Sequence, residues 1–430
     1  MDKYRDKYTS LNGPTHISCM LICLRVGVLF VLCIVCYLIA YIAWSTVIHE
    51  KEPTTNIHTT NSFPQTKSSS FQRKLICYFT TPSDSKNDLT PNHIDAFLCT
   101  HINVGIATIG DNRIVISDTL KETFKQMQTL KQTNMKLKIL IWIGGPSNSI
   151  EIIQMIHRHG SRQKFIKSIK SALDTYQLDG IDFDWEFPSS DSKIHFSQLL
   201  REIRREFTDK YLLSLAVAAP EGIAYFAYNF NILNQYCDYI NVMTYDFHFY
   251  STSSPFTGLN APLYRRSNEQ SVLATLNINA SLSFWNSSGL DKSKIIVGIP
   301  TYGHSFRLVN PFNKKIGSPA DGFGSTGVLG FVTYNDVCVF DRHHIFATKV
   351  FDSITCSPYI SAGFEWISYE DERSVKCKTN YVNQADFGGV MIFSLNTDDY
   401  LSTCYYGEND HNDHTFPLTR AIRDLLFTKN

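Results

Sequence analysis

"LDGIDFDWEFP", residues 178–188, places four acidic residues within one short apolar run. Side chains two apart lie on the same face of a β-strand, at steps of about 6.6 Å, so Asp182, Asp184 and Glu186 are predicted to share one face. The large apolar side chains between them then occupy the other face. Carboxylates are depleted from strands, and three on one face favour a catalytic cluster. The alternative is a strand end whose acids cap the next helix.

Eight apolar runs of strand length recur along the chain after residue 74. Between many of them the apolar residues fall at helical spacings, as in residues 161–176 and 194–207. Alternating strands and helices predict an α/β fold, and eight such units predict a closed (β/α)8 TIM barrel with its active site at the C-terminal ends of the strands. The predicted strands are residues 75–79, 102–107, 138–143, 180–185, 212–219, 239–245, 294–300 and 388–395.

The connection between the seventh and eighth predicted strands is unusually long. Residues 302–370 exceed what one crossover helix needs. We expect this segment to form an inserted α+β subdomain.

The N-terminal part differs in composition from the rest. Residues 26–44 carry no charge, are mostly apolar and have the length that spans a bilayer. They are predicted to be a transmembrane signal anchor in contact with lipid, and the basic residues before them predict a cytosolic tail at 1–25. A flexible stalk at 45–73 and a barrel domain at 74–430, facing the lumen or the outside, complete a single-pass type II protein. The alternative is a secreted chain with a cleaved signal peptide.

Composition excludes several partners. The 40 basic and 40 acidic residues give a formal net charge of zero, so no long-range field draws the chain to nucleic acid. A glycine-rich phosphate loop is absent, and no nucleotide, cofactor or metal is predicted.

Cysteine usage and sequons fit an oxidising compartment. Some of the seven cysteines beyond the apolar segment should pair there, and their odd number leaves at least one over. Sequons at Asn279 and Asn286 permit N-glycosylation. The seven are Cys77, Cys99, Cys237, Cys338, Cys356, Cys377 and Cys404.

The spacing D-x-x-D-x-D-x-E at residues 179–186 resembles the signature of family 18 glycoside hydrolases, the chitinases and chitinase-like proteins. Further blocks that resemble this family are NVMTYDFH (241–248), VGIPTYGHSFRL (297–308) and FGGVMIFSLNTDDY (387–400). The likeness runs in order from about Lys74 to the C-terminus.

The resemblance implies hydrolysis of chitin or other β-1,4-linked N-acetylglucosamine glycans by a substrate-assisted, retaining mechanism, which the two-carboxylate scheme for glycosidases treats as an exception. Glu186 would protonate the glycosidic oxygen, and Asp184 would orient the acetamide and hold its N–H. Asp182 would sit behind Asp184 and share its proton, while Tyr245 would donate to the acetamide oxygen.

The same resemblance implies further roles. Disulfides would join Cys77 to Cys99 and Cys338 to Cys404, whereas a pair of Cys356 with Cys377, leaving Cys237 free, stays open. The residues implied to contact the sugar are Met243, Asp246, Tyr302, Phe393 and Tyr78.

The pattern departs from the family at aromatic positions. Chitin-degrading members carry exposed tryptophans along the cleft, but here Phe393 and Pro146 stand at two such positions. Trp142 occupies a position that is normally small, and Ile106 stands where the family usually has Phe. We expect Trp142 to fill the released volume in the barrel core; the alternative is that it reaches the sugar site. These departures keep open a second function, a weak or inactive chitinase-like lectin that binds N-acetylglucosamine glycans.

Overall fold

The computed structural model describes residues 72–82, 88–405 and 414–428, all within the compact unit Ser70–Asn430. The predicted cytosolic tail, the anchor at 26–44 and nearly all of the stalk lie outside these residues and stay predictions. Within the described ranges, no helix has both the length and the apolar character needed to cross a membrane.

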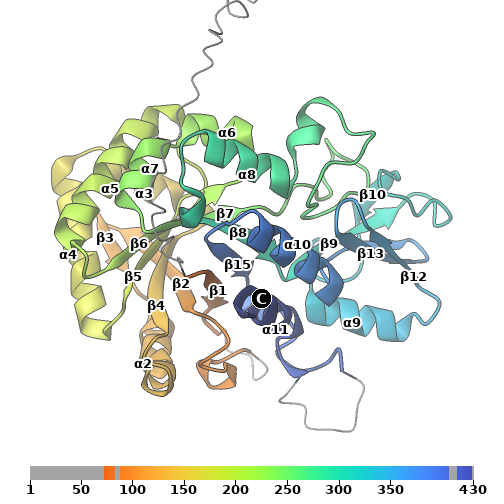
Figure 1. Cartoon of the computed structure of the whole chain (residues 1–430), viewed down its shortest axis with the longest axis horizontal. Helices are drawn as coiled ribbons and strands as arrows, with labels where there is room; N and C mark the ends of the chain where they lie inside the picture. Colours follow the sequence, from red (N-terminus) through yellow and green to blue (C-terminus); the bar gives the residue numbers. More distant parts are fainter. Residues whose placement is uncertain (1–71, 83–87, 406–413, 429–430) are drawn as a thin grey trace, which may run out of the picture. The chain divides into compact units, whose positions relative to one another are not determined.

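Eight parallel strands close into the predicted barrel (Figure 1). The first strand pairs with the last on one side and with the second on the other, which joins the two ends of the sheet. An additional short strand, β3 (Arg113–Val115), pairs antiparallel with the end of the second barrel strand. The barrel strands are β1 (Lys74–Thr80), β2 (His101–Gly110), β4 (Lys138–Gly144), β5 (Gly180–Asp184), β6 (Leu212–Ala218), β7 (Tyr239–Met243), β8 (Ile295–Pro300) and β15 (Gly389–Phe393).

Helices connect the strands and surround the barrel (Figure 1). The two helices predicted from apolar spacing are α4 (His159–Tyr176) and α5 (Lys193–Phe207). The other helices of the barrel are α2 (Asp118–Thr133), α3 (Ser149–Ile156), α6 (Glu221–Ala227), α7 (Phe230–Tyr236), α8 (Ile278–Ser287), α10 (Glu372–Gln384) and α11 (Pro417–Phe427).

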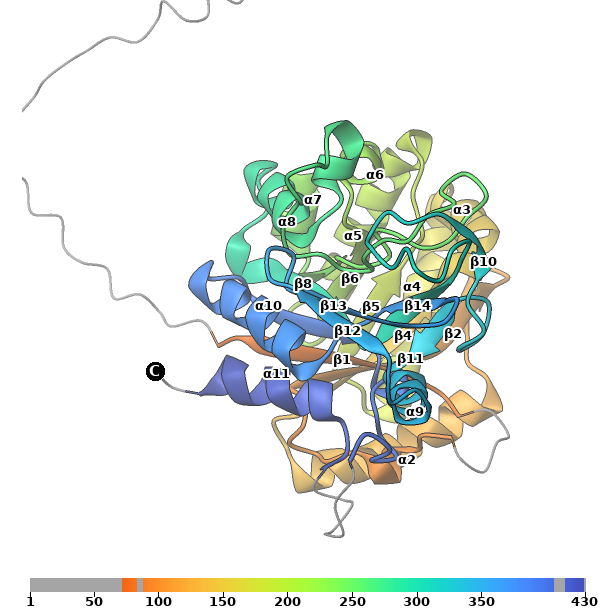
Figure 2. The ribbon, with the colours of Figure 1, turned by 90° about the vertical axis from the view of Figure 1, so that its right-hand side faces the viewer.

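A second, antiparallel sheet lies between β8 and α10 in the sequence, in the segment expected to be inserted. Its strand order is β10-β9-β14-β13-β12, with β11 paired to β9, and α9 (Tyr334–His343) accompanies it (Figure 2). The strands are β9 (Tyr302–Leu308), β10 (Ala320–Phe323), β11 (Phe331–Thr333), β12 (Thr348–Asp352), β13 (Ser357–Ala362) and β14 (Glu365–Ser368). Because β9 begins two residues after β8 ends, this sheet starts at the C-terminal end of a barrel strand.

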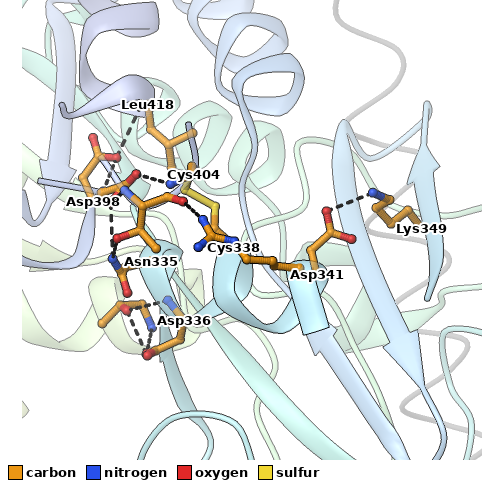
Figure 3. The surroundings of a disulfide bond; sticks show 12 residues. Asn335, Asp336, Cys338, Asp341, Lys349, Asp398, Cys404 and Leu418 are labelled. Atoms are coloured by element: carbon orange, nitrogen blue, oxygen red, sulfur yellow. Dashed lines mark hydrogen bonds and ion pairs between the residues drawn. A yellow bond between two sulfur atoms is a disulfide. The ribbon is translucent and has the colours of Figure 1, made fainter. Parts of the chain in front are cut away.

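Three disulfides cross-link the described part of the chain. Cys77–Cys99 and Cys338–Cys404 confirm the two predicted pairs, and the latter ties α9 to the segment after β15 (Figure 3). The third pair, Cys356–Cys377, resolves the alternative that the sequence left open. Cys237 is buried and free.

The barrel strands separate two apolar layers. On β5, Ile181 and Phe183 belong to the large core between the barrel and its helices, where the Phe183 ring lies 6.0 Å from that of Phe165. Burying an aromatic side chain of this size stabilises the fold by about 1.5–3 kcal/mol. Asp182 and Asp184 point the other way, into the barrel, as the strand period predicts. The outward apolar residues therefore fix which face of β5 the acids occupy.

Candidate active site

Asp182 lies inside the barrel, fully buried, and three other barrel strands supply its hydrogen bonds. Ser214 on β6 and Asn241 on β7 donate to its Oδ1 atom at 2.6 and 2.9 Å. The Tyr78 hydroxyl on β1 donates to its Oδ2 atom. Both carboxyl oxygens of Asp182 thus accept hydrogen bonds inside the barrel.

Asp184 ends β5 and is 3% exposed. Its Oδ2 atom accepts a hydrogen bond of 3.0 Å from the indole Nε1 of Trp142, whereas its Oδ1 atom is buried and has no hydrogen-bond partner among the described residues. The backbone beside it is tight, because a Cβ on Gly144 (φ +118°) would lie 1.9 Å from the Asp184 carbonyl oxygen. Glycine at this turn therefore lets β4 close against the end of β5.

Glu186 lies two residues beyond the end of β5, so the expectation that all three acids share one strand is wrong at this position. Its side chain is half-buried, and no described residue donates a hydrogen bond to its carboxyl group. The Ser149 hydroxyl instead donates to the Glu186 backbone carbonyl at 3.1 Å. A loop position gives the carboxyl group an approach to solvent that the two aspartates lack.

The three carboxyl groups have no basic partner: in the described ranges, no Lys, Arg or His forms an ion pair with any of them. Burial raises the pKa of Asp182 to about 6. Burial, followed by the charges of Glu186 and Asp182, raises the pKa of Asp184 well above its usual range, and the bond from Trp142 opposes this rise. Burial and then Asp246 raise the pKa of Glu186. Such a cluster retains a proton near neutral pH and can act as a general acid.

Tyr245 lies two residues after β7 and is 8% exposed. Its hydroxyl has one weak contact, 3.8 Å to the sulfur of Met391. Burial and the charge of Asp246 raise the Tyr245 pKa, so the hydroxyl stays protonated and can donate. Met243, the last residue of β7, is half-buried and packs with Tyr245 in the barrel interior.

Asp246 is exposed and adopts a left-handed backbone conformation (φ 57°). The buried Asn260 side chain holds this turn: its Oδ1 atom accepts from the Asp246 backbone N–H at 2.8 Å, and its Nδ2 atom donates to the Tyr302 carbonyl at 3.1 Å. His304 Nε2 lies 2.7 Å from Asp246 Oδ1. The loop after β7 is thereby joined to β9 beside Glu186, whose pKa Asp246 raises.

Tyr78, Trp142, Tyr245, Tyr302 and Phe393 form an aromatic cluster at this end of the barrel. The Phe393 ring lies 5.5 Å from that of Tyr78, 5.7 Å from that of Trp142 and 6.0 Å from that of Tyr245. Phe393 is half-buried, whereas Tyr78 is 1% exposed and its hydroxyl is used by Asp182. Tyr78 therefore supports a carboxyl group from within the barrel, a position that differs from the expected sugar contact.

Trp142 points into the barrel, as its strand parity predicts, and is 5% exposed. Room for the indole comes from Gly105 on β2, where a Cβ would lie only 2.9 Å from Trp142 Cβ and Cε3. Trp142 is thus buried, as the core interpretation expected, but the space beside it comes from Gly105, which that interpretation did not name, and its hydrogen bond to Asp184 was not expected.

Three polar residues of the site were not predicted from the sequence. Ser214 and Asn241 occupy inward positions of β6 and β7, and a polar residue at inward parity in an apolar strand was a usable signal. Asn260 lies in a loop, where strand parity gives no signal.

The two sequons both lie on α8. The Asn279 side chain accepts a hydrogen bond of 3.0 Å from the Tyr381 hydroxyl, and Asn286 is half-buried. Glycosylation at either residue stays a prediction. In the part of the chain that is described, no group of three or more His, Cys, Asp or Glu side chains is suited to hold a metal ion.

Comparison with known proteins gives consistent matches. Residues 74–398 match the family described as Glycosyl hydrolases family 18. Chitotriosidase-1 of Mus musculus is 32% identical over 377 residues, covering 82% of this chain and 78% of its own. An immunomodulatory active chitinase from Trichuris suis superimposes with a TM-score of 0.76 at 30% identity, over 83% of this chain and all of its own. Human YKL-39, described as a pseudo-chitinase with retained chitooligosaccharide binding, has the same TM-score and identity, over 82% of this chain and 99% of its own.

Proposed function

This chain belongs to glycosyl hydrolase family 18, and from that membership we propose that it cleaves β-1,4-linked N-acetylglucosamine glycans by a substrate-assisted, retaining mechanism. One observation carries the proposal. A carboxyl cluster without basic partners lies at the C-terminal end of β5, and one buried oxygen of Asp184 has no hydrogen-bond partner in the described structure.

In the first step, Glu186 gives its proton to the glycosidic oxygen, and the bond from that oxygen to the anomeric carbon breaks. The carbonyl oxygen of the substrate's own acetamide attacks the anomeric carbon and forms an oxazolinium ion. Asp184 Oδ1 accepts the acetamide N–H, and the negative charge of Asp184 stabilises the cation.

In the second step, Glu186, now ionised, takes a proton from water as the water attacks the anomeric carbon. The carbon–oxygen bond of the oxazolinium opens, and the anomeric configuration is retained. Glu186 suits both roles because it is half-buried, has a raised pKa and lacks a competing hydrogen bond.

The supporting residues have matching positions. Among the described residues, the Tyr245 hydroxyl has one acceptor, the weakly accepting sulfur of Met391, so it is available to donate to the acetamide oxygen. Asp182 is held by three donors behind Asp184 and contributes negative charge that raises the Asp184 pKa. Met243, Asp246, Tyr302 and Phe393 line the same end of the barrel and are proposed sugar contacts.

A glycan-binding protein with little turnover is the second candidate. The observation that favours it is the aromatic cluster. Trp142 and Tyr78 fill the barrel next to Phe393, and Phe393 itself stands at a position where chitin-degrading members of the family are expected to carry a tryptophan. The pseudo-chitinase relative shows that the family includes binding without hydrolysis.

We also propose that the barrel domain faces the lumen or the outside. Three disulfides in the described structure fit an oxidising compartment. Anchoring by residues 26–44 remains part of this proposal, with secretion as its alternative.

Reporter release from fluorogenic N,N'-diacetylchitobioside and the matching trioside tests the function. The full-length chain should release the reporter, and Glu186→Gln should not. If the folded wild-type chain is no faster than Glu186→Gln on either substrate, hydrolysis of these glycans is excluded. Binding of tetra-N-acetylchitotetraose by calorimetry then tests the second candidate.

A further inference from the structure

We infer that Trp142 is a positioning residue: its indole N–H holds Asp184 as a hydrogen-bond acceptor and so keeps the shared catalytic proton on Glu186. The inference rests on the proposed function, because it concerns the carboxyl pair that would perform the chemistry. The hydrogen bond of 3.0 Å between Trp142 Nε1 and Asp184 Oδ2 is its direct evidence.

The indole can reach Asp184 because β2, β4 and β5 lie side by side and together give it a direction and a space. Trp142 on β4 lies directly opposite Asp182 on β5, so its ring extends along the strand to Asp184, two residues further on. Gly105 on the other side of β4 leaves the space that the ring fills. Edge-on contacts with Tyr78 and Phe393, at 5.1 and 5.7 Å between ring centroids, fix the orientation of the ring.

An indole N–H is only a donor, and this decides its effect. It can bond to an ionised carboxylate oxygen or to the carbonyl oxygen of a protonated carboxyl, but the ionised form is bonded more strongly. Burial and then the charge of Glu186 raise the pKa of Asp184, so near neutral pH these two adjacent carboxyl groups hold one proton between them. A donor aimed at Asp184 favours the arrangement in which Asp184 is ionised and Glu186 carries the proton, which is the arrangement that protonates a leaving group.

The remaining groups around Asp184 do not supply this bias. The ionisable groups that face it are Asp182 on the same strand, Glu186 after it, Tyr78 on β1, Tyr228 before α7 and Tyr245 after β7. None of these is a cation, and the nearby Asp246 raises the pKa of Glu186 further. Within the described residues, Trp142 is the one donor to the Asp184 side chain.

The fixed Oδ2 atom also leaves Oδ1 as the acceptor for a ligand. Oδ1 is buried and has no hydrogen-bond partner among the residues that the structure describes, and an unmade hydrogen bond at a buried carboxylate is costly. An acetamide N–H is the donor that a bound N-acetylglucosamine unit would offer. Trp142 thus occupies one oxygen of Asp184 with a hydrogen bond and leaves the other available to the substrate.

Trp142→Phe in the full-length chain is the test, because it removes the N–H and keeps most of the ring. The pH profile of kcat/KM on the fluorogenic trioside is measured for wild type and variant. We expect kcat to fall about tenfold with little change in KM, and the acid limb to move upward by about one pH unit, the effect of one lost bond to a charged group. The sign follows because the ionised Asp184 loses its donor, so its pKa rises and activity is lost at higher pH.

Trp366→Phe is the matched control. Trp366 is also fully buried and donates its indole N–H, to the Lys314 carbonyl at 3.1 Å, but it lies in β14 of the second sheet. This variant should lose stability and keep the wild-type pH profile. In the Asp184→Asn background, Trp142→Phe should cause no further shift of the acid limb.

Two results would overturn the inference. One is a Trp142→Phe enzyme that melts at a lower temperature but keeps the wild-type kcat and acid limb; the other is an equal shift in the Asp184→Asn background. If the wild-type chain binds tetra-N-acetylchitotetraose without cleaving it, hydrolysis fails while the inference is tested by calorimetry. The midpoint for loss of binding at acid pH should then move upward by about one unit in Trp142→Phe, and an unmoved midpoint would reject it.

Discussion

The two ends of β5 carry acids of the same motif in opposite surroundings. At the N-terminal end, Asp179 accepts from Lys131 and Lys138 at 2.7 and 3.3 Å and from the Ile139 backbone N–H at 2.8 Å. At the C-terminal end, the described residues give the Asp184 side chain one neutral donor and the Glu186 carboxyl group none. The first acid has the partners of a structural carboxylate, whereas the others have the isolation that keeps a proton available for catalysis.

This contrast separates stability from chemistry along a single strand. Asp179 and its two lysine partners join the start of β5 to α2 and β4, which stabilises the fold. At the other end, burial and the neighbouring acids raise the pKa of Asp184, which costs folding free energy. Substitutions at the two ends should therefore have opposite consequences.

Among the aspartates of the motif, Asp184→Asn should have the largest effect. The amide keeps the shape of the side chain but cannot carry the negative charge that stabilises the oxazolinium ion, so kcat should fall on the order of 10²–10³-fold. Steady-state kinetics on the fluorogenic trioside measure this loss, and urea unfolding of the same sample checks the fold. A variant with more than a tenth of wild-type kcat would remove Asp184 from the mechanism.

Asp182→Asn should remove the pH dependence of stability that Asp182 contributes at the catalytic end. Because the folded pKa of Asp182, about 6, lies above the unfolded value, its contribution is fully present below about pH 4 and is lost as the pH rises through 6. Asparagine cannot ionise, so the gain in unfolding free energy over wild type should be larger at pH 8 than at pH 4 by about 2–3 kcal/mol.

Urea unfolding of both proteins at the two pH values measures that difference. An equal difference at pH 4 and pH 8 would show that Asp182 ionises as easily in the folded chain as in the unfolded one.

Asp179→Asn should lower the stability of the protein and leave its activity nearly unchanged. Losing two ion pairs in a partly buried setting should lower the unfolding free energy by about 1–2 kcal/mol, because the lysines and the strand end lose a charged acceptor. The kcat/KM of the folded protein should stay within about twofold of wild type, since Asp179 lies at the opposite end of the strand from the chemistry. A large loss of kcat with unchanged stability would contradict the division between the two ends.

Lys131→Met should have the smallest effect. Its Nζ atom lies 2.7 Å from Asp179, with the lysine side chain 22% exposed, and such pairs contribute about 0.5 kcal/mol. Denaturant unfolding at low and high salt measures it, and the difference from wild type should shrink at high salt because ions screen the pair.

Strand periodicity explains why so much of the barrel could be predicted. Ile181 and Phe183 fix the outward face of β5 by local alternation, so the inward direction of Asp182 and Asp184 follows from the sequence. The same reasoning placed Trp142 in the interior. The two disulfides implied by the family resemblance were confirmed as well.

Contacts between strands and loops could not be predicted from local sequence patterns. The bond from Trp142 to Asp184 depends on space left by Gly105, on a third strand. Asn260 holds Asp246 from 14 positions further along the chain, and such a return has no period in the sequence. Glu186 was expected on the strand, but β5 ends at Asp184 and the glutamate lies in the loop.

Comparing kcat/KM for wild type, Glu186→Gln and Asp179→Asn, as full-length proteins on fluorogenic N,N'-diacetylchitobioside, tests the central claim most directly. The claim predicts a loss of about 10³-fold in Glu186→Gln, the contribution of a general acid, and near-wild-type activity in Asp179→Asn. Equal rates for wild type and Glu186→Gln, with both proteins folded, would contradict it.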